Sequence, residues 1–146
     1  MEDILNYYQV NERLATSGQP TDTQFHDISS DGYEVVINLA MPDSSNAIKN
    51  EGNIVTSEGM IYIHLPVRWD KPEIEDVISF CNLMSVFQSQ KVWVHCAKNM
   101  RVSCFIYLYQ KHKLGMSEDV ADYPMREIWK PEGKWKDLIE SAESAL

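Results

Sequence analysis

Lys91 to Phe105 reads KVWVHCAKNMRVSCF, and this stretch decides the fold that we expect. An apolar, β-branched run ends at His95, Cys96 stands at a turn, and Arg101 enters a helical pattern. A short buried strand that leads by a tight turn into a helix is typical of a parallel α/β sheet. Such sheets bind ligands beyond the carboxyl ends of their strands, where helix N-termini favour anions. The stretch therefore predicts both the fold class and the place of a binding site.

The rest of the chain repeats this alternation, so we expect an α/β fold. Its centre is a mainly parallel sheet of four to five strands with helices on both faces. Strands are expected at 14–17, 35–39, 61–67 and 92–94, and helices at 21–30, 45–57, 72–87 and 100–114. The tail, from about residue 117 to 146, is expected to form helices broken near Pro124 and Pro131. A chain of 146 residues fits one domain, 1–146.

Charge and composition exclude several classes of function. The chain has 13 basic and 22 acidic residues and a net charge of −9, which argues against binding to nucleic acid or to an anionic membrane. No apolar stretch approaches the ~18 residues that span a bilayer, and the acidic start resembles no secretory signal. The chain has three cysteines, Cys81, Cys96 and Cys104, and they form no Cys-x-x-Cys pair. This suits a reducing compartment, so we expect a cytoplasmic protein.

The turn after the strand at 92–94 combines residue types that suit covalent chemistry on an anion. Cys96 at a helix N-terminus beside a cation favours the thiolate, the reactive form of cysteine. Arg101 offers a planar guanidinium for two phosphate oxygens. The remaining oxygens can bind to the backbone N–H groups of the turn, which belong to Ala97, Lys98, Asn99 and Met100. The alternatives without a catalytic role are that Cys96 is a buried structural thiol and that Arg101 is a solvated helix residue. His95 either supports the thiol or is a satisfied core histidine.

The segment from His95 to Arg101 resembles the signature loop of the cysteine-dependent protein tyrosine phosphatases. The usual loop has five residues between Cys and Arg, with a glycine among them, whereas this one has four and no glycine. The shorter spacing, the Ser-Gly-Gln-Pro at 17–20 and the strand at 35–39 resemble a bacterial subfamily related to the domain of beta-lactamase-hydrolase-like proteins. The resemblance covers roughly residues 12 to 112 and leaves the tail unmatched.

The resemblance implies a mechanism in two steps and no cofactor. Cys96 attacks phosphorus, a carboxylic acid protonates the leaving oxygen, and water then hydrolyses the phosphocysteine. The candidate acid is Asp70, in the loop after the strand at 61–67. An alternative is that Asp70 only caps the next helix, because Pro72 and Glu73 follow it.

Two departures from the family's loop bear on different claims. Asn99 stands where the family has glycine, and Asn tolerates a left-handed backbone. Val102 stands where the family usually has a Ser or Thr that assists hydrolysis of the phosphoenzyme, and Ser103 is the nearest candidate for that support. We therefore expect these departures to affect turnover more than anion binding.

We thus expect a cysteine phosphatase acting on a phosphomonoester, with phosphotyrosine among the candidates. Two alternatives stay open: a rhodanese-like sulfurtransferase, and a catalytically weak module that only binds phosphate. The expected partner is a phosphorylated protein or small molecule. Histidine spacing predicts no metal site.

Overall fold

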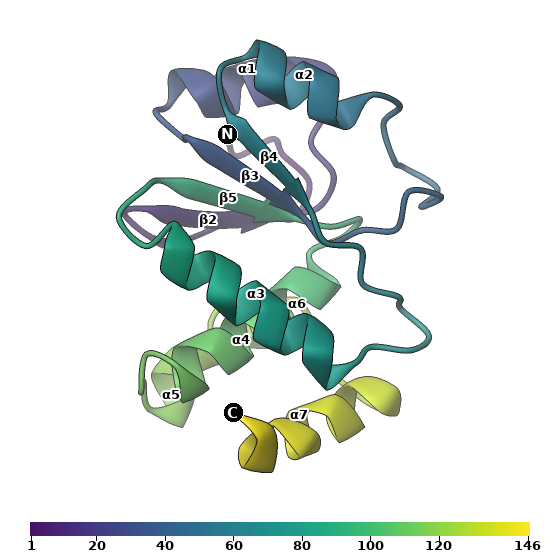
Figure 1. Ribbon diagram of the computed structural model, residues 1–146, viewed down its shortest axis with the longest axis vertical. Coiled ribbons are helices and arrows are strands. Elements are labelled where there is room, and N and C mark those ends of the chain that lie inside the picture. Colours follow the sequence, from purple (N-terminus) through teal and green to yellow (C-terminus); the bar gives the residue numbers. More distant parts are fainter.

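A computed structural model describes residues 1–146 and contains one five-stranded sheet (Figure 1). The strand order is β1-β2-β5-β3-β4. The strands β2, β5, β3 and β4 are parallel, and β1 is antiparallel to β2. Their bounds are β1 Tyr8–Asn11, β2 Leu14–Ser17, β3 Val35–Asn38, β4 Ile61–His64 and β5 Val92–His95. The expected mainly parallel α/β sheet is confirmed.

Helices cover both faces of the sheet (Figure 1). On one face lie α1, Asp22–Ser30, and α2, Glu51–Ser57. On the other lie α3, Ile74–Val86, and α4, Met100–His112, followed by the tail helices α5 Glu118–Ala121, α6 Met125–Ile128 and α7 Lys134–Ala145. The tail is broken near the two prolines, as predicted, because proline lacks the N–H that a helix interior needs.

The strands bury alternate side chains in two separate apolar clusters. Val35 and Ile37 point into the larger cluster with α3, α4 and α7, whereas Val36 and Trp93 point into the smaller one with α1 and α2. This is the period of two that a pleated strand imposes. Every residue of β5 is buried, so the strand that ends at His95 is held from both sides.

Three elements differ from the prediction by more than two residues. The strand β1 is not predicted from the sequence, because the half-exposed polar residues of this edge strand have no strong pattern. The helix α2 begins at Glu51 rather than at 45, since Asn50 takes a left-handed backbone with φ 62°. The strand β4 ends at His64, although the N–H groups of Leu65 and Val67 still donate to β3 and the residue after it.

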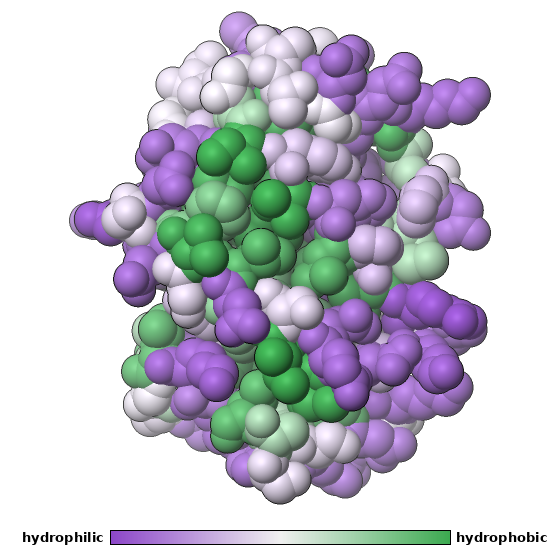
Figure 2. All heavy atoms as spheres, viewed as in Figure 1, coloured by the Kyte–Doolittle hydropathy of each residue, from purple (hydrophilic) through white to green (hydrophobic).

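The surface carries apolar side chains but no span for a bilayer. Figure 2 shows apolar side chains gathered near the middle of the face that carries β4 and α3. Ile61 of β4 and Ile78 and Val86 of α3 are among the exposed apolar residues. No helix of the structure has the length and apolar character needed to cross a membrane.

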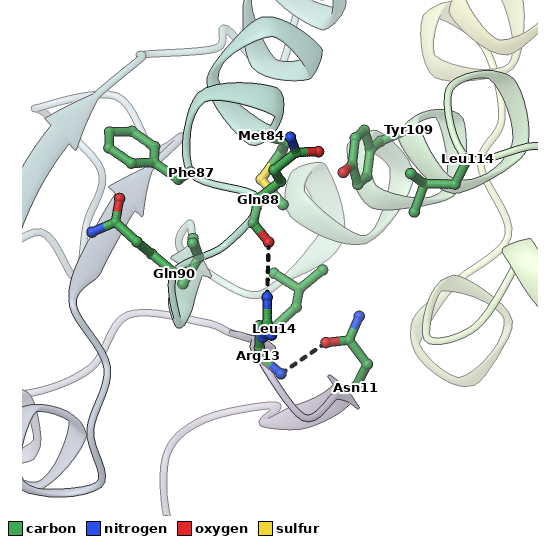
Figure 3. Close-up of a pocket in the computed structure, with 10 residues that line it drawn as sticks. Asn11, Arg13, Leu14, Met84, Phe87, Gln88, Gln90, Tyr109 and Leu114 are labelled. Atoms are coloured by element: carbon green, nitrogen blue, oxygen red, sulfur yellow. Dashed lines mark hydrogen bonds between the residues drawn. The ribbon is translucent and has the colours of Figure 1, made fainter.

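A pocket of about 260 Å³ lies at the amino end of β5 (Figure 3). Its lining includes Leu14, Met84, Phe87 and Tyr109 but no Cys, His or carboxylate. It therefore offers no nucleophile, and the chemistry has to be sought at the opposite end of the sheet.

Candidate active site

The turn from β5 to α4 lies at the carboxyl edge of the sheet, which faces right in Figure 1. Cys96 follows β5 directly, and α4 begins at Met100. Asn99 joins them with φ 66° and ψ 10°, the left-handed conformation for which glycine is the usual choice. The expectation that Asn99 could replace the loop glycine is confirmed.

Neighbouring segments hold the carbonyl groups of the turn from outside. The carbonyl oxygen of Ala97 accepts from the Gln19 N–H at 3.1 Å and from Asn46 Nδ2 at 3.0 Å. The carbonyl oxygen of Lys98 accepts from Asn6 Nδ2 at 3.0 Å. Asn99 returns this bond, since its Nδ2 donates to the Asn6 carbonyl at 2.9 Å. The turn is thus held by Asn6, by Gln19 of the Ser-Gly-Gln-Pro segment and by Asn46.

Four backbone N–H groups of the same turn have no hydrogen-bond acceptor. The N–H groups of Ala97, Lys98, Met100 and Arg101 donate to no acceptor in the chain. Backbone N–H groups that are exposed in a turn at a helix N-terminus form a nest for anionic oxygens. The turn is therefore suited to bind an anion beside Cys96, and we call residues 96–101 the anion cradle.

Arg101 supplies the cation of this cradle. Its side chain is 7% exposed, and its Nη1 donates to the carbonyl oxygen of Val67 at 3.0 Å. No carboxylate pairs with it. A nearly buried guanidinium without an anionic partner is costly, so the site is suited to an anion that completes it.

Cys96 and Arg101 share one pocket of about 320 Å³. Its lining is Trp69, Cys96, Ala97, Lys98, Met100 and Arg101. Cys96 itself is 1% exposed and lines this pocket. Burial raises the pKa of the Cys81 thiol to about 11, and burial also raises that of Cys104. The chain thus places one cysteine in the anion cradle and keeps the other two as buried thiols.

His95 lies beneath the turn in a polar network that sequence reasoning missed. Its Nε2 is 2.7 Å from Glu51 Oε2, and its Nδ1 is 3.2 Å from the Cys96 carbonyl oxygen. Gln19 Nε2 donates to Glu51 Oε1 at 2.6 Å. An acidic residue in the first turn of a helix is usually explained by the helix dipole, so Glu51 gave no signal of a partner 44 residues away.

Asp70 lies in an adjoining pocket of about 410 Å³ that shares Trp69 and Arg101 with the first. Its carboxylate is exposed and accepts from Arg68 Nε at 3.1 Å and Nη2 at 2.8 Å. The hydrogen bond from Arg68 lowers the pKa of Asp70 below its ordinary value. The interpretation of Asp70 as a helix cap is wrong, because the residue that caps α3 is Glu73.

Val102 and Ser103 point away from the pocket. Val102 is fully buried in the core. The Ser103 hydroxyl donates to the Met100 carbonyl at 2.9 Å and accepts from Trp129 Nε1 at 3.1 Å. The hydroxyl is thus engaged with the tail. No group of three or more His, Cys, Asp or Glu side chains is arranged to hold a metal ion.

The tail holds the loop that carries Trp69 and Asp70. Trp135 Nε1 donates to the Trp69 carbonyl at 2.9 Å, and Lys134 Nζ donates to the Asp70 carbonyl at 2.8 Å. The rings of Trp69, Trp129 and Trp135 pack together with centroid separations of 5.3 to 5.9 Å. Trp69 remains 46% exposed, so this tryptophan cluster presents one indole to the pocket.

A parallel sheet with a cysteine, an anion cradle and an arginine at its carboxyl edge defines a phosphatase of the cysteine-dependent class. Residues 2–134 match the family described as DSP-PTPase phosphatase fused to NAD+ kinase, and the chain belongs to this family. The match runs beyond the stretch of resemblance at 12–112 and includes most of the tail. The family supports the phosphatase interpretation over the sulfurtransferase one.

Solved structures agree with this assignment. A DUF442 protein of Shewanella putrefaciens CN-32, assigned as a phosphatase, is 34% identical with a TM-score of 0.87, over 99% of this chain and 95% of that one. Tk-PTP in its active form is 15% identical with a TM-score of 0.79, over 97% and 98% of the two chains. Pseudomonas aeruginosa TpbA is 16% identical with a TM-score of 0.68, over 96% and 82%. The last two share the fold. No curated protein matches the chain.

Proposed function

We propose that the protein hydrolyses a phosphomonoester in two steps, with Cys96 as the nucleophile and a phosphocysteine as the intermediate. The observation that carries this proposal is the shared pocket. In it the Cys96 side chain lies beside backbone N–H groups without acceptors and a guanidinium without a carboxylate. Donors fixed before the reaction begins stabilise the charge that develops on the phosphoryl oxygens.

In the first step the Cys96 thiolate attacks phosphorus and the bond to the leaving oxygen breaks. The N–H groups of Ala97, Lys98 and Met100 bind the oxygens that do not react, and Arg101 takes two of them in a bidentate contact. In the second step water attacks the phosphocysteine and returns the thiolate with inorganic phosphate. Lys98 adds positive charge at the mouth of the pocket.

Asp70 is the acid that we assign to the leaving oxygen. It shares with the Cys96 pocket two lining residues, Trp69 and Arg101. An acid must carry a proton when the substrate binds, whereas Arg68 favours the carboxylate. The assignment therefore requires that Arg68 releases Asp70 in the substrate complex. Asp43 lines the same adjoining pocket and is the natural comparison.

Rapid acid quench tests the nucleophile independently of the natural substrate. The protein is mixed with 4-nitrophenyl phosphate, quenched, digested and analysed by mass spectrometry. We expect a phosphoryl group on the Cys96 peptide, none in Cys96→Ser, and an unchanged yield in Cys81→Ser, whose cysteine is about equally buried but lies outside the pocket. Absence of both adduct and product across a pH series would refute the proposal.

The substrate class is proposed as a phosphorylated protein or small molecule. PTPMT1 was solved in complex with PI(5)P and TpbA in complex with phosphotyrosine, and both have the fold of this chain. Both ligands carry a phosphomonoester, which supports that class here without choosing between the two kinds of leaving group.

A catalytically weak phosphate-binding module is the second candidate, and the environment of Ser103 favours it. With Val102 buried and the Ser103 hydroxyl engaged by Trp129, neither residue offers a hydroxyl to assist the second step. Stopped-flow kinetics separate the candidates. A burst of one equivalent of 4-nitrophenol followed by almost no turnover supports the module, whereas steady turnover at the burst rate supports the enzyme.

A further inference from the structure

Glu51 is a buried acid directly behind the phosphate-binding turn. It is 6% exposed and stands at the first position of α2, and its partner His95 is fully buried. The pair is joined at 2.7 Å, and Gln19 from the Ser-Gly-Gln-Pro segment donates to the other carboxylate oxygen. A buried acid that is not part of the reaction pocket needs a reason, because burying a charge is costly.

The surroundings keep Glu51 ionised despite its burial. Burial alone would raise its pKa, but hydrogen bonds from His95, Gln19 and Tyr62 outweigh it, and the pKa lies below the ordinary value. An ionised Glu51 accepts a hydrogen bond from the imidazole ring, and this contact orients the ring beneath Cys96.

Other charged groups reach the Cys96 pocket from different directions. Arg101 and Lys98 lie on its own turn, Arg68 and Asp70 on the loop after β4, and Asp43 on the loop after β3. These groups lie at or beyond the mouth of the site, except for Arg101. Glu51 and His95 act from beneath, through the covalent link between His95 and Cys96 and the contact to the Cys96 carbonyl.

We propose that Glu51 is a positioning residue for the Cys96 nucleophile. It fixes the orientation of His95, whose Nδ1 faces the Cys96 carbonyl oxygen, and this holds the first peptide of the turn so that its N–H groups stabilise the Cys96 thiolate. Hydrogen bonds join Gln19 to Glu51 and Glu51 to His95, and Cys96 follows His95 directly. This series links the ends of β2 and β5 to the start of α2. The inference rests on the proposed function insofar as Cys96 is the nucleophile.

Alkylation by iodoacetamide at a series of pH values tests the inference without any substrate. The rate is measured on the Cys96 peptide by mass spectrometry, because only the thiolate reacts. For Glu51→Gln we expect the pH midpoint to rise by about one unit, so that the rate at neutral pH falls about tenfold while the alkaline plateau stays the same. The buried Cys81 and Cys104 serve as internal references for exposure.

The helix α2 offers a matched control. Glu58 caps its other end and pairs with the exposed His26 at 2.8 Å. Glu58→Gln removes the same charge from the same helix, and we expect its alkylation profile to match that of the wild type. An equal shift in both variants would overturn the inference, because it would show a general charge effect rather than positioning.

The outcomes also separate this inference from the proposed function. A folded Glu51→Gln with the wild-type profile overturns the inference alone. A wild-type midpoint that matches the reference cysteines removes the thiolate on which both proposals depend. If Glu51→Gln does not fold, Gln19→Ala decides, since it keeps the pair and removes one hydrogen bond. A smaller rise in the midpoint supports the inference, and an unchanged profile overturns it.

Discussion

At the residue scale, the exposed Asp70 has the clearest test. If it protonates the leaving oxygen, Asp70→Asn should lower kcat by about 10²-fold for alkyl phosphates, whose leaving groups need the proton, and far less for 4-nitrophenyl phosphate. Asp43→Asn should lower both rates equally or not at all. Steady-state kinetics with the two substrates measure the difference. The reverse pattern in the two variants would transfer the role to Asp43.

Arg68 sets the pH range in which Asp70 holds a proton. Its hydrogen bonds lower the pKa of Asp70, so the protonated form is lost at a lower pH than in a free carboxyl group. Removing Arg68 returns that pKa toward its ordinary value. In Arg68→Ala we therefore expect the alkaline limb of the kcat/KM profile, which reports the free enzyme, to move to higher pH. A limb that stays in place would show that another group donates the proton.

The arrangement of the turn could be predicted from the sequence because it depends on neighbours in the chain. The order of strand, Cys96, Asn99 and Arg101 determines a cradle, since a tight turn before a helix leaves its N–H groups without acceptors. Glu51 could not be predicted in this way. Its role depends on the contact with His95, which only the packing of α2 on the sheet creates.

At the scale of elements, the end of β2 supports the turn after β5. An added Cβ at Gly18 would lie 2.7 Å from the Ala97 carbonyl oxygen, so the backbone of the turn would have to shift. We expect Gly18→Ala to weaken phosphate binding at least tenfold, measured by isothermal titration calorimetry with inorganic phosphate.

Gly115 provides the comparison for this substitution. Its φ of +68° strains any other residue, but an added Cβ there meets nothing within 4 Å. Gly115→Ala should cost about 1 kcal/mol of unfolding free energy and leave phosphate affinity unchanged. Equal phosphate affinity in the two variants would show that the end of β2 does not hold the turn after β5 in place.

The elements themselves are predictable to the extent that burial repeats along the chain. The strands with both faces buried and the amphipathic helices α3 and α4 carry that repeat. The short edge strand β1 does not, and the segment before α2 is mistaken for helix because the left-handed turn at Asn50 has no distinctive pattern. The tail helices are predictable, but their contact with the loop at 69–70 depends on tertiary packing.

At the scale of the whole molecule, the tail packs against the loop at 69–70. Trp135→Ala removes an indole that is 3% exposed and the hydrogen bond to the Trp69 carbonyl. We expect a loss of about 3–5 kcal/mol of unfolding free energy, measured with urea, and a lower kcat at temperatures where the variant remains folded.

Leu138 on the same helix is the control, because it is buried to a similar degree and makes no contact with the loop by hydrogen bond. Leu138→Ala should cost about 2–5 kcal/mol and leave kcat unchanged in the folded protein. If both variants lower kcat alike, the tail stabilises the fold without holding the loop.

The tryptophan cluster also gives the protein an intrinsic optical signal. Three indoles whose ring centres are 5.3 to 5.9 Å apart couple their electronic transitions, which imposes a strong signature on the near-ultraviolet circular dichroism. One of these chromophores borders the anion pocket, so an arriving ligand changes the polarity around it. Occupancy of the site can therefore be followed by emission, with no dye attached and no substrate consumed.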